Sequence, residues 1–548
     1  MNNDDILRQF LERLSFTFDG KTFNFPFPEE SAEERMRLRT SHRNERFIYK
    51  NKSAADSKPL LSIYSPDKPY KIYPLDYWFS DKWDPLYYGR DFDFNRPFFD
   101  QFHELSLAVP RANMVTMQNE NSDYTTGTGF CKNCYLINSS EHCEDCYYGK
   151  LLQNSKNCVD SSYVYDSEIL YQCFNVRKLY SCFYVYNSSN SNDCYFCDNV
   201  SNCRNCFLSV DLNGKEYYFM NEKCSSKEDY EQKIQEFFGS YSKIQKALEV
   251  FNDIRKKRIY KYAEIMNCEN SVGDFIKNSK NCLNCYDVVD SEDCLNLQVG
   301  MKVKDIYDSS NMYVGPELSY QTLGVIETFN VHFSLYQFNS SDIFYSDSCY
   351  NSKNCFACIS LNKKEYCIFN KQYSKEEYEK LVARIIEHMI KTAEWGKFFP
   401  SELSPFGYNE TLANEYLPLE KEEAIAKGYK WSDYEKPESE FDQVFKANQL
   451  PDTINEVGDE ILNSVIECER SSKNFKITAQ ELRFYRRNKL PLPHIHPDLR
   501  YNQRIQLRKP RRTWSRPCMK CSTLVESVFD TESKETVYCE KCYLAEVY

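Results

Sequence analysis

A lattice of cysteines between residues 131 and 206 constrains the fold of this chain more than any other feature. Eleven cysteines lie in this stretch, and every gap between neighbouring members is a multiple of three residues. Short alternating runs such as YVYD at 163–166 are separated by clusters of Asn, Ser and Asp. This pattern is typical of short strands joined by turns, and its regular spacing predicts a β-solenoid.

The lattice returns in weaker form between residues 268 and 367, and the two blocks end in similar sequences. Cys206 corresponds to Cys355, and the matches continue downstream with Asn213 and Asn362, Glu216 and Glu365, and Asn221 and Asn370. The stretch 225–262 has helical spacing, and 374–395 begins with a capping-box pattern. The sequence therefore predicts an internal duplication of a solenoid-plus-helix unit.

The fold class that we expect is mainly β, with a duplicated Cys-rich β-solenoid, interspersed α-helices and a C-terminal zinc ribbon. Composition and pattern divide the chain into eight segments. They are a basic, degenerate ribbon-like module (1–72), an aromatic cap segment (73–124), solenoid block 1 (125–224), a helical linker (225–262), solenoid block 2 (263–373), a helix and arm (374–430), an acidic linker (431–462) and a basic zinc-ribbon module (463–548).

The strongest metal-binding motif lies at the C-terminus. Two Cys-x-x-Cys pairs, Cys518/Cys521 and Cys539/Cys542, flank a segment that reads as a hairpin. Two thiolate pairs on two knuckles make a tetrahedral four-sulfur site, which predicts one zinc ion. Because four protein ligands fill the coordination sphere, this zinc would be structural and not catalytic.

The lattice cysteines have two interpretations. Six Cys-x-x-Cys pairs lie in the lattice, and the pairs 131/134 and 143/146 make the best quartet for a further metal. Alternatively, the cysteines are a ladder of small buried side chains inside the coils, since free Cys packs as a small hydrophobe. The unpaired Cys158, Cys173 and Cys182 keep the same phase and favour the ladder.

A basic aromatic stretch at 483–516 is a candidate nucleic-acid contact. It holds eleven Lys or Arg residues and one acidic residue. Clustered cations beside aromatic rings and a zinc ribbon suit a phosphate backbone, of RNA or DNA. The alternatives are a solvated basic face, or a face that docks on the acidic linker. The candidate residues are Arg486, Arg487, Arg504, Arg508, Lys509, Arg511, Arg512 and Trp514.

The segment 81–93 offers the only enzymatic hypothesis that the residues support. Asp91 and Asp93 would point the same way on a strand, and paired carboxylates on a β-helix can hydrolyse glycosides. The alternative is an aromatic cap that closes the open end of the solenoid. We assign no catalytic residue, because the seven histidines are scattered and make no Ser-His-Asp arrangement.

Composition excludes several further classes. The chain has 548 residues but only 15 Gly, and it contains neither a Gly-x-Gly-x-x-Gly nor a Gly-x-x-x-x-Gly-Lys-Ser/Thr run. Rossmann and P-loop nucleotide binding are therefore unsupported. The N-terminus lacks a signal-like apolar run, and no stretch is long enough to span a bilayer. We expect a cytoplasmic protein with no membrane contact. A net charge of −12 also admits a nucleic-acid mimic.

Several stretches resemble one protein family. They include SIYSPDKPYKIYPLDYWFSDKW, the NSKNC repeats, EWGKFFPSELSPFGYNET and VYCEKCYLAEVY. The chain is similar to cysteine-rich repeat proteins of candidate-phylum bacteria, which often carry the label CaiB/BaiF, or class III CoA-transferase. That label implies an α/β fold and an aspartate that forms an acyl anhydride. The residues supply no pattern for this activity.

The resemblance also implies further zinc knuckles in both terminal modules, from which this chain departs. Residues 25–49 align without gaps to 490–514, which links the two ends as copies of a basic module. The expected pairs read Pro28 to Ser31, Cys468 to Ser471 and His496 to Leu499. Overall, the sequence favours a non-enzymatic zinc-binding scaffold with a macromolecular partner. An enzyme, either the CoA-transferase or a hydrolase at 81–93, is the alternative.

Overall fold

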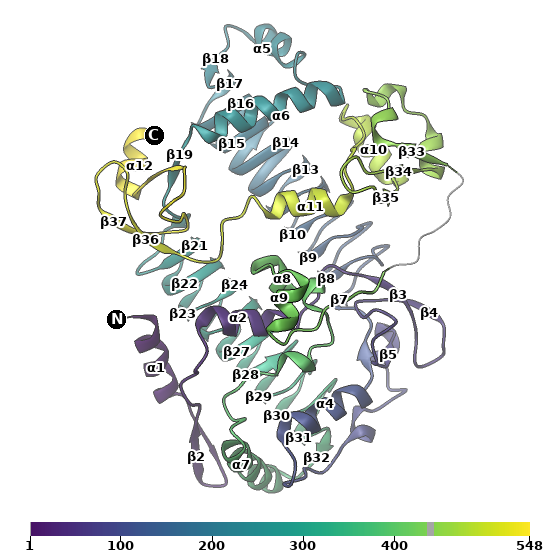
Figure 1. Cartoon of the computed structure of the whole chain (residues 1–548), viewed down its shortest axis with the longest axis vertical. Coiled ribbons are helices and arrows are strands. Elements are labelled where there is room, and N and C mark those ends of the chain that lie inside the picture. Colours follow the sequence, from purple (N-terminus) through teal and green to yellow (C-terminus); the bar gives the residue numbers. More distant parts are fainter. Residues whose placement is uncertain (1, 436–442, 548) are drawn as a thin grey trace.

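The computed structural model describes residues 2–435 and 443–547. Two β-solenoids, each built of parallel strands, form its centre (Figure 1). Block 1 is a 12-stranded sheet from β7 (Thr116–Met117) to β18 (Glu222–Lys223), and block 2 is a 13-stranded sheet from β20 (Ile265–Met266) to β32 (Lys371–Gln372). The β-solenoid predicted from the cysteine lattice is confirmed, as is its mixture with helices. Seven residues of the predicted acidic linker, 436–442, lie outside the described residues.

The strands of each block follow one another with short breaks. Block 1 contains β8 (Thr126–Gly129), β9 (Asn138–Glu141), β10 (Lys150–Gln153), β11 (Lys156–Val159), β12 (Ser162–Tyr165), β13 (Glu168–Tyr171), β14 (Phe174–Asn192), β15 (Tyr195–Ser201), β16 (Arg204–Asn213) and β17 (Glu216–Phe219). Block 2 contains β21 (Val272–Lys277), β22 (Lys280–Val289), β23 (Glu292–Leu295), β24 (Gln298–Met301), β25 (Lys304–Tyr307), β26 (Ser310–Tyr313), β27 (Glu317–Ile326), β28 (Phe329–Leu335), β29 (Ser341–Phe344), β30 (Lys353–Phe356) and β31 (Glu365–Ile368).

Each turn of the solenoid is four-sided. Paired residues lie 12 positions apart, as in Lys150 opposite Ser162. From Phe130 to Asp211, every third residue has a positive φ, between 48° and 58°. Asn and Asp adopt this left-handed conformation more readily than most residues, and they are frequent at these corners. Three residues therefore make one side, and the spacing of three in the cysteine lattice is the length of a side.

The lattice cysteines face the inside of the turns. They pack in one buried cluster with Val, Leu and Ile from the same phase. The Cys131 thiol lies within hydrogen-bonding distance of the Gly129 carbonyl at 3.3 Å. Inward serines also join the turns, since Ser140 Oγ donates to the Asn138 carbonyl and accepts from the N–H of Leu152. Cys and Ser suit these positions because four side chains share the interior of each turn, where they pack beside the larger Val, Leu and Ile.

Helices and short strands cover the blocks (Figure 1). On the N-terminal side are α1 (Asn3–Arg13), β1 (Ser15–Phe18), β2 (Lys21–Asn24), α2 (Ala32–Thr40), β3 (Tyr49–Lys52), β4 (Pro59–Ser62), β5 (Ile72–Tyr73), α3 (Leu75–Trp78), η1 (Pro85–Tyr88), α4 (Phe98–Ala108) and β6 (Arg111–Ala112). Between the blocks are α5 (Lys227–Ile234), α6 (Tyr241–Lys256) and β19 (Ile259–Lys261).

The remaining elements follow block 2. They are α7 (Lys375–Lys391), η2 (Ser401–Leu403), η3 (Tyr408–Glu410), α8 (Leu412–Tyr416), α9 (Lys421–Ala426), β33 (Val444–Lys446), η4 (Ala447–Gln449), η5 (Ile454–Glu456), η6 (Asp459–Asn463), β34 (Val465–Glu467), β35 (Asn474–Phe475), α10 (Ala479–Arg487), α11 (Pro497–Ile505), β36 (Trp514–Pro517), β37 (Leu524–Ser527), β38 (Thr536–Tyr538) and α12 (Glu540–Val547).

The N-terminal part of the chain docks on block 2, and the C-terminal part docks on block 1. Helix α2, near the N-terminus, places Arg35 against Asp308 of block 2, with the closest N–O distance 3.0 Å. Helix α11, near the C-terminus, places Arg500 and Arg504 against Asp160 of block 1. All five side chains are buried. Breaking one partner of such a pair strands a charge in the interior, so these contacts fix how the terminal helices dock.

Candidate metal centre and charged surfaces

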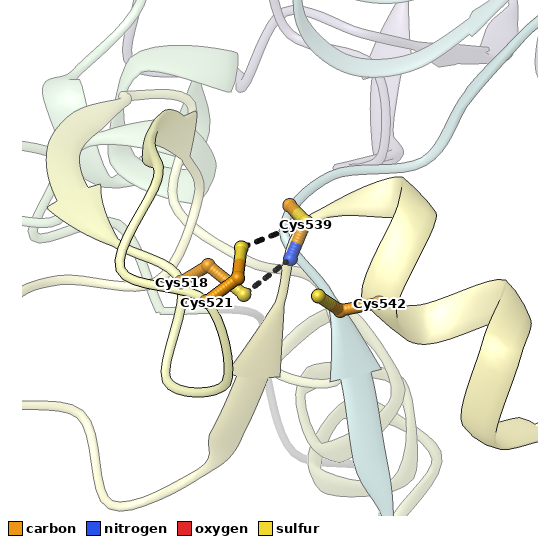
Figure 2. Close-up of side chains that lie close together, drawn as sticks. All are labelled: Cys518, Cys521, Cys539 and Cys542. Atoms are coloured by element: carbon orange, nitrogen blue, oxygen red, sulfur yellow. Dashed lines mark hydrogen bonds between the residues drawn. The ribbon is translucent and has the colours of Figure 1, made fainter.

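The four C-terminal cysteines gather at one point of the ribbon. Their sulfur atoms all lie within 4.8 Å of one another, and no other group of this kind occurs in residues 2–435 and 443–547. Cys518 and Cys521 come from the knuckle between β36 and β37, and Cys539 and Cys542 from the start of α12 (Figure 2). The four cysteines of the sequence motif thus lie together, in a group that could hold a metal ion.

The local electrostatics favour thiolates at this point. The N–H of Cys539 donates to the Cys518 sulfur at 3.2 Å. Burial opposes ionisation of Cys518, but backbone N–H groups, led by that of Cys539, outweigh it and lower the pKa. Hydrogen bonding with Thr523 lowers the pKa of Cys521 to about 6. A metal requires deprotonated sulfur, so these contacts prepare the site for a cation.

The ribbon is docked on the start of block 2. Strand β38 pairs in parallel with β19, which precedes that block. The Val528 N–H donates to the Tyr262 carbonyl, and Val528 and Val537 share a buried cluster with Tyr286. The helix α12 reaches block 1, where the Asn199 amide donates to the Tyr543 hydroxyl at 2.6 Å. The four-cysteine site therefore lies in an element that connects the two blocks.

An N-terminal segment repeats the ribbon without its cysteines. Strands β3 and β4 pair in the register that β36 and β37 use, with Tyr49 opposite Ser62 as Trp514 is opposite Ser527. Strand β5 pairs with β6 before block 1, as β38 pairs with β19 before block 2. Continuing this correspondence places Ser53, Asp56, Pro74 and Tyr77 at the four cysteine positions. Sequence comparison found only its beginning, in the match of 25–49 to 490–514.

A third, partial knuckle lies at Cys468. Strands β34 and β35 pair antiparallel around it, and Ser471 takes the place of the second cysteine. The Cys468 sulfur accepts hydrogen bonds from the N–H groups of Arg470 and His496. Of the residues expected to match a second C-terminal site, only Cys468 and His496 have side chains that bind metals.

The lattice cysteines make no second group of this kind within the described residues. Their thiols lie near backbone carbonyls of their own and the next turn, as Cys143 does with the carbonyls of Glu141 and Leu152. Their side chains are buried, apart from the partly buried Cys268. This arrangement is the one expected of a ladder of small apolar side chains.

The eight candidate nucleic-acid contacts divide into two sets. Arg504, Arg508 and Arg511 are buried against Asp160 and Asp287 in the seam between the blocks. The other five are exposed or partly exposed, of which Arg486 pairs with Asp459 and Lys509 with Glu535. Arg512 lies over the Trp514 ring at 5.2 Å. The remaining member of the set is Arg487.

The exposed members lie at separate places. Helix α10 carries Arg486 and Arg487, and in Figure 1 it is far from β36, which begins at Trp514. Around α10, the segment 470–489 has additional exposed cations that the candidate set missed: Arg470, Lys473, Lys476, Arg483 and Lys489. For Arg483 the signal was the amphipathic pattern of α10, which buries Phe484 and Tyr485 and turns the arginines outward. The other four lie outside the helix, where no such pattern marks them.

Asp91 and Asp93 lie in the aromatic segment, which runs across the last strands of block 2. The Phe92 ring packs on Phe369, and a side chain at Gly89 would collide with the Asn370 backbone. Lys371 donates to Asp91 and lowers its pKa, and the N–H of Asn95 does the same for Asp93. A general acid needs a raised pKa, so this geometry favours the cap interpretation.

Comparisons with known proteins give no parallel: no family model, no curated protein and no solved structure matches the chain. In the part of the chain that the structure describes, none of the helices combines the length and the apolar character that a membrane crossing needs.

Proposed function

We propose that this protein is a zinc-stabilised scaffold that contacts the phosphate backbone of a nucleic acid through the segment 470–489. The observation that carries the proposal is the charge of this segment. All seven of its Lys and Arg residues are exposed, whereas its only acidic residue, Glu481, is buried. Exposed cations without intervening acids suit a polyanion, whose condensed counterions are released on binding.

The chemistry of the segment favours phosphates over bases. Its three aromatic residues, Phe475, Phe484 and Tyr485, are all buried. Stacking of unpaired bases needs accessible rings, so the segment lacks the means for it. We therefore propose backbone contacts of low sequence specificity, with a duplex as the natural target. Asp459 pairs with Arg486 and removes part of the charge of that residue, so Arg483 and Arg487 are the stronger contacts.

Zinc is the metal that this proposal assigns to the four-cysteine site. Four thiolates suit Zn²⁺, and a complete set of protein ligands gives it a structural role. The solenoids then serve as a rigid frame, since repeated turns supply a long regular surface with a fixed shape. The enzymatic alternatives have no comparable support, because Asp91 is paired with Lys371 and the aspartate chemistry of the CoA-transferase label has no assigned site.

Binding of the full chain to fluorescent duplex DNA and RNA of random sequence tests the proposal. We expect affinity to fall steeply between about 50 and 200 mM salt, by roughly one log unit per log unit of salt for each phosphate contacted. The double variant R483E/R487E should bind at least tenfold more weakly. The control K227E/K375E reverses two exposed cations at the starts of α5 and α7 and should bind as the wild type does.

Two results would contradict the proposal. One is binding that does not change with salt, and the other is equal loss of binding in the control and in the α10 variant. The variant R512E separates the two exposed sets, because it changes the cation beside Trp514 and leaves α10 intact. If only R512E weakened binding, the contact would lie on the ribbon and not on the segment 470–489.

A further inference from the structure

A column of alternating charges runs along one side of each block. In block 1 the stacked residues are Glu120, Lys132, Glu144, Lys156 and Glu168. In block 2 they are Glu269, Lys280, Glu292, Lys304 and Glu317. We call these two columns the outer ladders. Each member lies in the next turn of the solenoid, directly above the one before it.

The outer ladders are accessible to solvent. Glu120 and Glu269 have side chains that are 70% and 71% exposed, and Lys132 and Lys280 are both 48% exposed. Ion pairs join neighbouring rungs, as in Lys156 with Glu144 at 2.7 Å. Exposed pairs of this kind contribute little to stability, since the median is about 0–1 kcal/mol. Stability of the fold therefore does not explain why both blocks carry the same series.

The two blocks agree on this side and differ on a buried side. The first rung after the last Glu of each ladder is aromatic, the third is a cation and the fourth is Glu. These residues are Tyr180, Arg204 and Glu216 in block 1, and Phe329, Lys353 and Glu365 in block 2. The columns on that side, in which only Tyr195 and Phe219 are partly exposed, share two of seven residues. They read Tyr147, Val159, Tyr171, Phe183, Tyr195, Phe207 and Phe219 in block 1, and Leu295, Tyr307, Tyr320, His332, Phe344, Phe356 and Ile368 in block 2.

This contrast is the reverse of what packing alone produces. Buried positions are normally the more constrained, because their side chains must fill a fixed volume, whereas exposed positions tolerate change. A surface that keeps its charge order while the covered side next to it changes is constrained by something that touches it. The outer ladders are therefore candidates for a binding surface.

The spacing of the charges restricts what can bind. Neighbouring rungs of a parallel sheet are about 4.8 Å apart, with charge of alternate sign. A nucleic-acid backbone carries only negative charge. An α-helix repeats every 5.4 Å, and side chains on one face of a strand are about 6.6 Å apart, so both lose register within about four rungs. A second β-solenoid whose successive turns carry alternating charges matches this spacing. The chain itself has two such ladders, one in each block.

We propose that the outer ladders bind the outer ladder of a second copy of this chain. Two identical ladders cannot meet in register, because Glu would face Glu and Lys would face Lys. With a shift of one rung, every Glu in the overlap faces a Lys, and four opposite-charge pairs form between two five-residue ladders. The series is the same in both blocks, so either ladder of one copy can meet either ladder of the other.

The contact is small and depends on ionic strength. Nine rungs at about 4.8 Å and a side about 10 Å wide bury roughly 800 Å² in total. This area is below that of stable complexes, which places the contact among weak and transient ones. Charges exposed at the surface are screened over about 10 Å at 0.1 M salt and about 3 Å at 1 M. Association is therefore expected at low salt and not at high salt.

Sedimentation of the full chain over a range of concentrations tests the proposal. At about 20 mM salt, the average mass should rise with concentration, and at about 500 mM it should stay at that of one chain. A neutral variant with Gln at all ten ladder positions should remain a single chain at both salt concentrations. Its melting temperature, compared with that of the wild type, shows whether the fold is intact.

A ladder in which every Glu is changed to Lys and every Lys to Glu supplies a control, because neighbouring rungs of the chain still carry opposite charges. The variant E120K/K132E/E144K/K156E/E168K, with the block 2 ladder neutralised, still alternates in sign. Mixed with a chain whose only charged ladder is the native one of block 1, it can pair in register with five contacts instead of four. Mixed dimers should then be favoured about 1.5- to 5-fold over each self-pair, for one added pair of about 0.2–1 kcal/mol.

Three outcomes would overturn the proposal. The wild type could stay a single chain at low salt and high concentration. The neutral variant could associate as the wild type does, which would place the contact elsewhere. The mixture of native and inverted ladders could show no preference for mixed dimers, which would exclude matching of charge along the rungs.

Discussion

The sulfur of Cys468 accepts a hydrogen bond from the backbone N–H of His496, over 3.2 Å. Cys518 accepts from Cys539 over the same distance in the four-cysteine site. Helix α11 begins directly after His496, as α12 begins directly after Cys539. The surroundings of Cys468 thus resemble those of Cys518, with Ser471 and Leu499 at the positions that Cys521 and Cys542 have in the four-cysteine site.

This relationship predicts that a second metal site can be restored. The variant S471C/L499C supplies the two missing thiols, which join the Cys468 sulfur and the His496 imidazole in a set of three sulfurs and one nitrogen that suits zinc. We expect bound zinc, measured by elemental analysis, to rise from one to two ions per chain. The matched control S471C alone should leave it at one. A double variant that still binds a single ion would show that the two knuckles differ in more than their side chains.

Loss of the metal should loosen one end of block 2. In the variant C521S, or after chelation, the ribbon no longer has a closed coordination sphere, so the pairing of β38 with β19 should weaken. Hydrogen exchange of residues 259–262 should accelerate at least tenfold. The pairing of β5 with β6, in the metal-free counterpart, should exchange at an unchanged rate. Equal acceleration at both places would indicate a general loss of stability.

Removal of a buried carboxylate should destabilise the seam. Asp160 is fully buried and accepts from Arg500 and Arg504, so D160A leaves two guanidinium groups without a counter-charge. Breaking a buried pair costs about 3–5 kcal/mol, which should lower the melting temperature by several degrees. The exposed Asp123 provides a control, since D123A should melt as the wild type does. A small effect of D160A would mean that water replaces the carboxylate.

Stability should fall as the pH rises towards neutrality because of Asp274. Burial raises the pKa of this carboxyl to about 7. Between its usual pKa and that value, the folded chain binds a proton that the unfolded chain has lost, so the stabilising contribution decreases with rising pH. The contribution is fully present at low pH and is lost as the pH passes about 7.

The variant D274N keeps an oxygen for the N–H of Glu264 but carries no charge. Thermal melts between pH 4 and 8 should show a weaker pH dependence for D274N than for the wild type. The difference in unfolding free energy approaches about 4 kcal/mol at pH 8, from roughly three pKa units. Parallel melting curves for the two proteins would show that Asp274 does not titrate in this range.

The cysteine lattice predicted the solenoid because its period is a geometric property of the turn. Residues such as Cys131 and Cys134 face inward from successive sides, and each side is three residues long. The four-cysteine group was predictable for a similar reason, since the spacing of Cys518 and Cys521 is that of a knuckle. Both features depend on neighbours in the sequence.

The seam was not predictable, because it depends on contacts far apart in the chain. Arg504 and Arg508 read as an exposed basic stretch, yet each meets a carboxylate of a distant turn. Nothing in the local sequence distinguishes an arginine that pairs inside the protein from one that binds a phosphate. The exposed cations around α10 were missed for the complementary reason, since Arg470 and Arg483 are separated in the sequence.

The attachment points of the two ribbons constrain the relative lengths of the two solenoid blocks. The C-terminal ribbon pairs with β19 at the start of block 2 and contacts Asn199, late in block 1, through Tyr543. Its N-terminal counterpart begins at the start of block 1 and brings Trp78 to Tyr350, late in block 2, with ring centroids 5.2 Å apart. Each ribbon, with the helix that follows it, thus acts as a brace that joins the start of one block to a late turn of the other. Insertion of a whole 12-residue turn would preserve the geometry of the block that receives it, but it would leave a brace about 4.8 Å short. Any lengthening that the protein tolerates must therefore occur in both blocks together.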